Sequence, residues 1–282
     1  MPENANRTRA VFRDLHKAGC FVMPNPWDAG SAWCLESLGF AALATTSAGF
    51  AFSRALPDTA TALALDDVLA NITQIVRATT LPVNADFQTG FAADADGVAA
   101  NVTRCIATGV SGLSIEDATG DPHRPLFGID EAADRIRAAR AAIDASGHDV
   151  LLTARAECFL VGHPDPVAES IRRLRAYADA GADVLFAPGA RGRDEIRALI
   201  EAAGPKPMNV LVSARTDLRV ADLAALGARR ISLGSALARA AWAGFLRAAE
   251  GIKDRGSFDT LDQLAPFSQL NALFDRSSPR AE

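Results

Sequence analysis

The eight residues AGADVLFA (180–187) combine the two local signals on which the fold of this chain depends. Gly181 ends a helical stretch, because glycine is preferred at the position that follows a helix. The run 184–187 is continuously apolar, as a parallel strand buried on both faces requires. The same order recurs in ALGARRISL (225–233), where Gly227 precedes another apolar run. A helix that leads through a glycine into a buried strand is typical of α/β proteins.

Eight such apolar runs are spread along the chain, separated by amphipathic stretches that mostly open on an aspartate. This number of strand–helix units favours a closed (β/α)8 barrel over an open, doubly wound sheet. The expected strands are 21–24, 41–45, 82–86, 112–116, 150–155, 184–187, 209–212 and 230–233. The expected helices are 28–38, 66–77, 94–108, 130–145, 165–180, 194–203 and 220–226.

The chain is expected to form a single barrel domain over residues 1–282, with the barrel core at 20–245. A helix within residues 1–18 precedes the core, and residues 246–282 form a C-terminal helical extension whose tip, DRSSPRAE (275–282), is expected to be frayed. This tail is longer than one closing helix and keeps many apolar residues, as in LARAAWAGFLRAAEGI (237–252). An apolar tail of this length predicts packing between subunits.

Composition excludes several classes of protein. Hydrophobic residues make up 49% of the chain, and its formal net charge is -5, without a basic stretch suited to nucleic acid. No apolar run is long enough for a membrane helix, and the first residues lack a signal-peptide core, so we expect a cytoplasmic protein. The four cysteines lack the close spacing of zinc ligands and are expected to be reduced thiols.

Three charged side chains end three consecutive expected strands: Asp86, Glu116 and Arg155. Neighbouring strands lie about 4.8 Å apart, so the two carboxylates can reach one point. Such a pair suits Mg²⁺, which takes one or two carboxylates and keeps waters or substrate oxygens. Arg155 can then hold a substrate carboxylate. The alternative is a purely structural ion-pair network of the same three residues.

Lysine and histidine positions restrict the chemistry further. Imine chemistry needs a lysine at a strand end, whereas Lys17 and Lys253 fall in expected helices and Lys206 precedes a strand. His16 and His148 are expected to be solvated residues at helix ends. His123 and His163 follow the fourth and fifth strands, where a catalytic acid can sit, although exposed loop residues are the commoner alternative. A metal site without histidine argues against zinc or non-haem iron.

Seven motifs, in this order, resemble the isocitrate lyase/phosphoenolpyruvate mutase superfamily over roughly residues 20–245. They are NPWDAGSA (25–32), TTSAGFAFSRALPD (45–58), LPVNADFQTGF (81–91), GLSIED (112–117), LLTARAECFLVG (151–162), NVL (209–211) and ISLGSALARAA (231–241). The resemblance implies a barrel that binds Mg²⁺ and a 2-oxo acid or its enolate, and that makes or breaks a C–C or P–C bond. It also implies exchange of the last barrel helix between subunits of a homodimer or homotetramer.

The same resemblance implies roles for individual residues. Asp86 is the direct Mg²⁺ ligand, with Glu116 acting through water, Asp58 near the metal waters, and Gln88 where the superfamily commonly has a second acid. The substrate-binding residues are Trp27, Ser47, Ala48, Gly49, Arg155 and Asn209, of which 47–49 bind the oxo-acid carboxylate partly through backbone N–H groups.

The loop after Glu116 departs from the superfamily pattern. The segment EDATGDPHRPLFGID (116–130) has neither the cysteine of the lyases nor the lysine and asparagine of the mutases, and His123 and Arg124 are its only ionic substitutes. We therefore assign catalysis to Arg155, Glu116 and His123. The leading hypothesis is Mg²⁺-dependent C–C cleavage next to a small 2-oxo-carboxylate through a metal-stabilised enolate. The alternatives are a phosphonomutase-like enzyme acting on a P–C bond and a non-catalytic barrel that binds an oxo acid.

Overall fold

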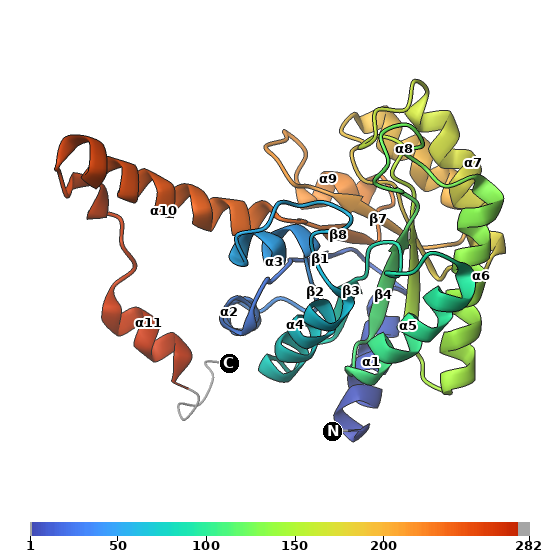
Figure 1. Cartoon of the computed structure of the whole chain (residues 1–282), viewed down its shortest axis with the longest axis horizontal. Helices are drawn as coiled ribbons and strands as arrows, with labels where there is room; N and C mark the ends of the chain where they lie inside the picture. Colours follow the sequence, from blue (N-terminus) through green and yellow to red (C-terminus); the bar gives the residue numbers. More distant parts are fainter. Residues whose placement is uncertain (1, 276–282) are drawn as a thin grey trace.

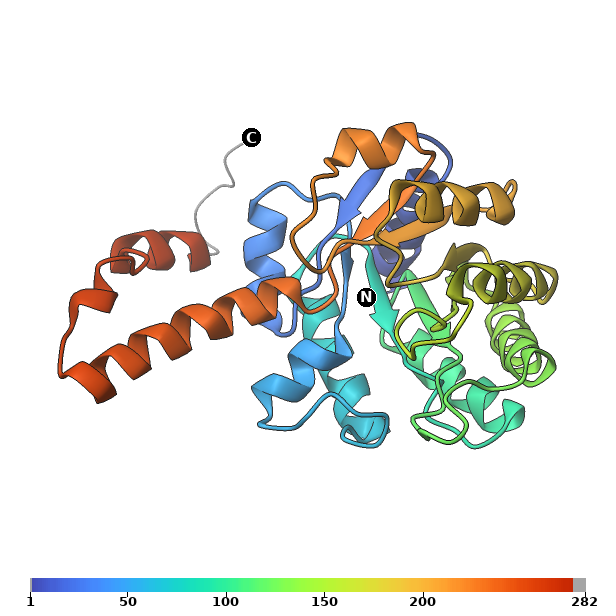
Figure 2. The same ribbon diagram turned by 90° about the horizontal axis from the view of Figure 1, so that it is seen from above.

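Eight parallel strands form one sheet in the order β1-β8-β7-β6-β5-β4-β3-β2. The computed structural model describes residues 2–275, and Figure 2 shows the strands enclosed by a ring of helices. The strands are β1 (Phe21–Met23), β2 (Leu43–Ala44), β3 (Val83–Asp86), β4 (Gly112–Glu116), β5 (Leu151–Arg155), β6 (Val184–Phe186), β7 (Met208–Leu211) and β8 (Arg230–Ser232). The predicted (β/α)8 barrel is confirmed, and each expected strand lies where the sequence placed it, within one or two residues at its ends.

The helices between the strands are also close to their predicted positions. They are α2 (Ala29–Ser37), α4 (Leu65–Ala78), α5 (Ala95–Ala107), α6 (Ile129–Ser146), α7 (Pro166–Asp179), α8 (Arg193–Ala203) and α9 (Val220–Ala225). Gly181 and Gly227 both have φ of +100°, the left-handed conformation expected after a helix. One further helix, α3 (Ser47–Ser53), lies where a loop was expected, and the Thr46 side chain caps it by accepting from the Gly49 N–H.

The barrel closes between β1 and β2 through a few specific contacts. The Ala44 N–H donates to the Pro24 carbonyl at 3.0 Å. The Asn25 amide donates to the Thr45 carbonyl at 2.9 Å, and its oxygen accepts from the Leu233 N–H at 3.0 Å. Asn25 therefore joins the ends of three neighbouring strands and completes the ring.

The first helix, α1 (Pro2–Leu15), covers the amino-terminal end of the barrel (Figure 1). Phe12 is fully buried and packs with Met23, Ala42 and Leu151. The expectation that His16 is solvated is wrong, since only 7% of this residue is exposed. It is buried because α1 lies against the barrel, where the His16 ring meets the rings of Phe12 and Phe21 edge to face.

The C-terminal extension leaves the barrel as one long helix. Figure 1 shows α10 (Ala236–Arg255) projecting outward, followed by the 3-10 turn η1 (Asp259–Leu261) and by α11 (Phe267–Phe274), which returns toward α2. The Trp33 indole donates to the Leu273 carbonyl at 2.5 Å and fixes this return. The expected frayed tip falls almost wholly on residues 276–282, outside the described part. The description of residues 1–282 as one domain stays a prediction.

No helix within residues 2–275 is long and apolar enough to cross a membrane. The four cysteines are free thiols, and Cys105 and Cys158 are buried.

Candidate active site

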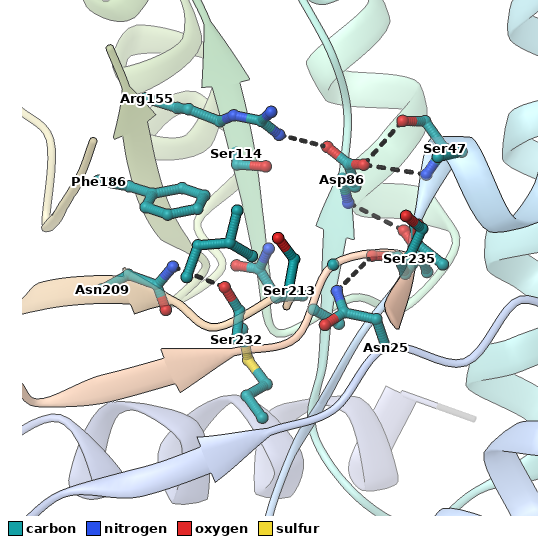
Figure 3. Close-up of a pocket in the computed structure, with 18 of the residues that line it drawn as sticks. Asn25, Ser47, Asp86, Ser114, Arg155, Phe186, Asn209, Ser213, Ser232 and Ser235 are labelled. Carbon is teal, nitrogen blue, oxygen red and sulfur yellow. Dashed lines mark hydrogen bonds and ion pairs between the residues drawn. The ribbon is translucent and has the colours of Figure 1, made fainter. Parts of the chain in front are cut away.

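A cavity of about 250 Å³ opens at the carboxyl ends of the strands, where barrel enzymes place their active sites. Figure 3 shows its polar side chains arriving from several different strands and converging on one space. Of the residues predicted for the site, six line this cavity: Ser47, Ala48, Asp58, Asp86, Arg155 and Asn209. The other five, Trp27, Gly49, Gln88, Glu116 and His123, are not part of the lining.

Asp86 is the central carboxylate of the cavity. Its Oδ2 atom accepts hydrogen bonds from the Ser47 N–H and the Ser47 hydroxyl, both at 2.9 Å (Figure 3). Its own N–H donates to the Thr45 hydroxyl at 2.9 Å. Its Oδ1 atom lies 3.5 Å from the Nη1 atom of Arg155. One carboxylate oxygen is thus held by α3, while the other faces the cation at the end of β5.

Arg155 links three carboxylates. The register of β4 and β5 pairs Glu116 with Arg155, and the Nη1 atom of Arg155 lies 3.1 Å from Oε2 of Glu116. Its Nε atom donates to Glu157, and its guanidinium carbon lies 5.4 Å from the centre of the Phe186 ring. Burial of this guanidinium opposes its charge, but the negative charges of Glu157, Glu116 and Asp86 outweigh burial and raise its pKa above the ordinary value.

Two acidic groups at the cavity, Glu116 and Asp58, have a pKa above the ordinary value of a carboxyl. Burial raises the pKa of Glu116 to about 8, against the opposing attraction of Arg155. Burial also raises the pKa of Asp58, and the negative charge of Asp86 adds to this effect. The acidic side of the cavity therefore favours a cation or a shared proton.

The donor set fits a hard divalent cation such as Mg²⁺. Within residues 2–275 no group of three or more His, Cys, Asp or Glu side chains is arranged as a ready-made metal cluster. Mg²⁺ does not need one, because it binds through one or two carboxylates and completes its shell with water or substrate oxygens. Asp86 is the residue placed to supply such a ligand, with Asp58 on the same cavity wall. The neutral Gln88 is buried, and its main-chain carbonyl accepts from the Glu116 N–H at 2.9 Å.

Ser47, Ala48 and Gly49 are the three residues predicted to bind an oxo-acid carboxylate. The N–H groups of Ser47 and Gly49 form hydrogen bonds within the protein. The Ser47 N–H donates to Asp86, and the Gly49 N–H donates to the side chain of Thr46. A β-carbon added at Gly49 would lie 2.7 Å from Thr46 Cγ2 and 3.1 Å from Trp27 Cβ. Gly49 and Trp27 therefore pack α3 against the barrel, whereas Ser47 and Ala48 face the cavity. The predicted substrate contacts stay predictions.

The loop that carries His123 is closed at its base as a small hairpin. Ala118 and Leu126 form an antiparallel bridge, and the Thr119 hydroxyl donates to the Arg124 carbonyl. Arg124 pairs with Glu131. The His123 N–H donates to Asp121 at 2.8 Å, and His123 is exposed. Its catalytic role stays a prediction, and in this structure it would require movement of the loop toward the cavity.

Arg230, a residue not predicted for the site, lies at the inner end of the cavity and is 1% exposed. It donates from Nε to Asn209 Oδ1 at 2.9 Å and from Nη2 to the Thr153 hydroxyl at 3.1 Å. Burial lowers its pKa to about 9. No carboxylate of residues 2–275 forms an ion pair with it. The only signal in the sequence is a charge inside an apolar run.

Lysine positions agree with the exclusion of imine chemistry. None of Lys17, Lys206 and Lys253 lines the cavity. Lys17 and Lys253 are exposed on α1's trailing turn and on α10, beside Asp14 and Asp254.

Comparison with known proteins finds relatives along nearly the whole chain. The family model described as phosphoenolpyruvate phosphomutase matches residues 12–253. A solved structure from Burkholderia cenocepacia J2315, assigned only provisionally as a lyase or mutase, is 43% identical, covers 97% of this chain and 97% of that chain, and has a TM-score of 0.92. An uncharacterized protein of Mycobacterium tuberculosis is 32% identical over 93% of this chain and 95% of its own length.

Oxaloacetate acetylhydrolase, solved in complex with its product oxalate, is 29% identical, covers 96% of this chain and 93% of that chain, and has a TM-score of 0.82. Other relatives carry the names of lyases, of a phosphorylmutase and of a phosphonopyruvate hydrolase.

Proposed function

Because the chain belongs to the phosphoenolpyruvate phosphomutase family, whose relatives are lyases and mutases, we propose that it is a Mg²⁺-dependent lyase that cleaves a C–C bond next to a small 2-oxo-carboxylate. The observation that carries this proposal is the arrangement around Asp86. One oxygen of this carboxylate is fixed by Ser47, and the other faces the cavity beside Arg155. Such an arrangement offers a ligand for a cation and, next to it, a guanidinium for an anionic substrate.

A divalent ion bound at Asp86 would act as a Lewis acid toward the oxygens of the oxo acid. The residues of the chain supply binding and orientation. Arg155 can leave Asp86 and Glu116 when a cation takes its place, and its planar fork suits a carboxylate. Burial raises the pKa of Glu116, so this carboxyl binds a proton more readily than a free one once Arg155 has left it.

A second candidate is cleavage of a P–C bond. The observation that favours it is the excess of guanidinium groups on the cavity wall, where Arg155, Arg230 and Arg239 stand against two carboxylates, Asp58 and Asp86. A phosphonate carries more negative charge than a carboxylate and would use more than one arginine. Relatives of both kinds are known.

The assay that tests the proposal compares oxaloacetate, 2-methylisocitrate and phosphonopyruvate as substrates with and without Mg²⁺. We expect turnover of an oxo acid or its hydroxy acid precursor that disappears with EDTA. Turnover of phosphonopyruvate alone would favour the second candidate. In parallel, calorimetry of oxalate with Mg²⁺ should show binding in the wild type and in the exposed control Asp130→Asn, and loss of binding in Asp86→Asn. Unchanged binding in Asp86→Asn would exclude the metal assignment.

We further propose that α10 and α11 pack against a second copy of the chain in a homodimer or homotetramer. Among the described residues, most of the exposed large apolar side chains lie in this extension: Trp242, Phe245, Leu246, Ile252, Phe258, Leu264, Phe267, Leu270 and Phe274. Exposed apolar surface of this extent typically marks a protein interface. Figure 1 shows α10 standing away from its own barrel, as an exchanged helix would.

A further inference from the structure

A second cavity lies at the amino-terminal end of the barrel, opposite the candidate active site. Its volume is about 720 Å³, compared with about 250 Å³ for the candidate active site. It is lined by α1, by the last turns of α4 and α5, by the start of β3 and by His148, which precedes β5 (Figure 1). Ligand pockets in proteins commonly measure about 300–1,000 Å³, so this space is large enough for a small organic molecule.

The charged side chains of this cavity are all arginines. Arg9, Arg77 and Arg104 belong to its lining, with His148 beside them, and the described residues of the lining include neither aspartate nor glutamate. The chain as a whole is acidic, with a formal net charge of -5. A concave surface whose charges have one sign concentrates ions of the opposite sign. The cavity therefore favours an anionic ligand.

Arg9 is buried in the wall of the cavity without a carboxylate partner. Only 3% of this residue is exposed. Its Nε atom donates to the Val110 carbonyl at 3.0 Å, and its Nη2 atom donates to the Ile106 carbonyl at 3.2 Å. Its Nη1 atom donates to Oδ1 of Asn6 at 3.4 Å. These three partners are neutral, so the hydrogen bonds of Arg9 are satisfied while its positive charge is not neutralised by an ion pair.

The acids around the cavity neutralise only part of its positive charge. Asp149 acts on Arg9 from a distance, but it already belongs to another ion pair. Arg104 pairs with Asp66, whose side chain is 82% exposed, so water and salt screen this contact. Arg77 is exposed, and within the described part of the chain no carboxylate lies within 4.0 Å of its guanidinium.

The helix ends at the cavity also offset part of the charge. Both α4 and α5 end here, and the C-terminus of a helix carries roughly half a negative charge. The two ends together therefore offset about one positive charge. Arg9 and Arg77, which have no carboxylate partner, supply two positive charges. An excess of about one positive charge is thus left for a ligand, before His148 is counted.

The remainder of the lining combines aliphatic side chains with threonines whose hydroxyl protons are already used. The hydroxyls of Thr8, Thr73 and Thr108 donate to main-chain carbonyls three or four residues earlier in the chain. The side-chain donors that a ligand can use are therefore chiefly the guanidinium N–H groups at the rim. The aliphatic side chains are Ala5, Val76, Leu81, Val83, Ile106 and Ala107.

The number of arginines indicates the kind of anion. A carboxylate can be satisfied by one guanidinium fork. A phosphate monoester carries a charge of about −1.5 to −2 at pH 7 and has three strong acceptor oxygens, so it can use several arginines at once. We propose that this cavity binds an organic phosphate, with the phosphate group between Arg77 and Arg104, near the charge of Arg9, and the organic part against the aliphatic side chains. This site is separate from the candidate active site, and the proposal does not depend on the proposed function.

The test titrates the full chain with three probes in calorimetry: inorganic phosphate, AMP and adenosine. The buffer contains EDTA and no Mg²⁺, and its ionic strength is held constant. In the wild type we expect AMP to bind more tightly than inorganic phosphate, because its ribose and base add contacts. Adenosine, which lacks the phosphate, should bind at least about tenfold more weakly than AMP, because it loses the charge-assisted hydrogen bonds.

The double variant Arg77→Ala/Arg104→Ala should weaken AMP and inorganic phosphate by about three- to tenfold, as the loss of two exposed charge pairs would. Both arginines are exposed, so the fold should persist. The matched control is Arg193→Ala/Arg197→Ala, which removes the same charge from α8, at exposed arginines that line neither cavity. This control should bind both phosphates as the wild type does.

Ala107→Trp tests where the organic part lies, because it adds a ring at an exposed position of the lining and keeps every charge. It should weaken AMP and spare inorganic phosphate. The proposal would be overturned by a wild type that binds neither phosphate, by unchanged affinity in the Arg77/Arg104 variant, or by equal weakening in both double variants. Unchanged binding of AMP by Ala107→Trp would overturn the placement of the organic part in this cavity.

Discussion

Asp117 and Arg173 form a buried ion pair in which Oδ2 and Nη1 lie 2.9 Å apart, with side chains 2% and 6% exposed. The same Nη1 atom donates to the Phe127 carbonyl at 2.9 Å, and the Phe127 N–H donates to the Asp117 carbonyl at 2.9 Å. The other oxygen of Asp117 accepts from the Glu157 N–H. This pair therefore holds both ends of the loop that follows β4, as well as the residue that binds Arg155.

Arg173→Met should destabilise the protein by about 3–5 kcal/mol, because it leaves Asp117 buried without its cation and Glu169 with only the more exposed Arg172. Urea unfolding monitored by circular dichroism measures this change. The control is Arg137→Met, whose partner Asp134 is as exposed as Arg137 itself, and there we expect less than about 1 kcal/mol. A similar loss of stability in both variants would show that the buried ion pair contributes no more than an exposed one.

Arg155 neutralises the same carboxylates that a bound cation would neutralise. In Arg155→Met the carboxylates Glu157, Glu116 and Asp86 lose the positive charge that offsets them, at a cost of about 3–5 kcal/mol. Mg²⁺ should restore part of this stability, because a ligand that binds the folded state alone stabilises it. We expect a larger rise of Tm with Mg²⁺ in the variant than in the wild type by differential scanning calorimetry. An equal rise of Tm in the variant and in the wild type would contradict the idea that Mg²⁺ and Arg155 neutralise the same carboxylates.

These contacts also show how much of the fold and of the candidate site can be predicted from the sequence. Asp86, Glu116 and Arg155 come together as expected, because parallel strands deliver their last residues to the same end of a barrel. Arg230 was missed for a different reason. Arg229 and Arg230 are identical as residue types, and only the strand register, which turns alternate side chains inward, buries Arg230 and leaves its neighbour partly exposed.

The error at His16 has a comparable cause. A polar residue at the end of a predicted helix is normally solvated, and its burial depends on where α1 docks, a long-range contact that no local pattern contains. The helix α3 was missed because seven residues are too few for a helical period to stand out. The Asp117–Arg173 pair was missed because its members are 56 residues apart.

The burial of His16 predicts how the free energy of unfolding changes at acidic pH. Burial lowers its pKa to about 3, and the nearby charge of Arg230 contributes. The unfolded chain has the ordinary value of about 6.5 and thus binds more protons than the folded chain between these two pH values. Stability from this group is therefore complete above pH 6.5 and falls as the pH drops toward 3, by up to about 1.4 kcal/mol for each pH unit.

The variant His16→Gln removes this titration, so its free energy of unfolding should change less than that of the wild type between pH 7 and pH 5. Urea unfolding at the two pH values measures the difference, and His148→Gln, at an exposed histidine, is the matched control. A wild type and a His16→Gln variant with parallel profiles would show that His16 does not govern this range.

The exposed pair Trp242 and Phe245 predicts the state of assembly. Their ring centres lie 5.6 Å apart on α10, and they are 39% and 61% exposed. If a second chain covers them, Trp242→Glu/Phe245→Glu places two charges in an apolar interface, where an unpaired buried charge is strongly unfavourable. Light scattering after size exclusion should then show a shift from dimer or tetramer to monomer. Leu38→Glu, at an apolar residue of the barrel surface that is 68% exposed, should leave the mass unchanged. A monomeric wild type, or a double variant that still associates, would contradict the proposed packing of α10 against a second copy.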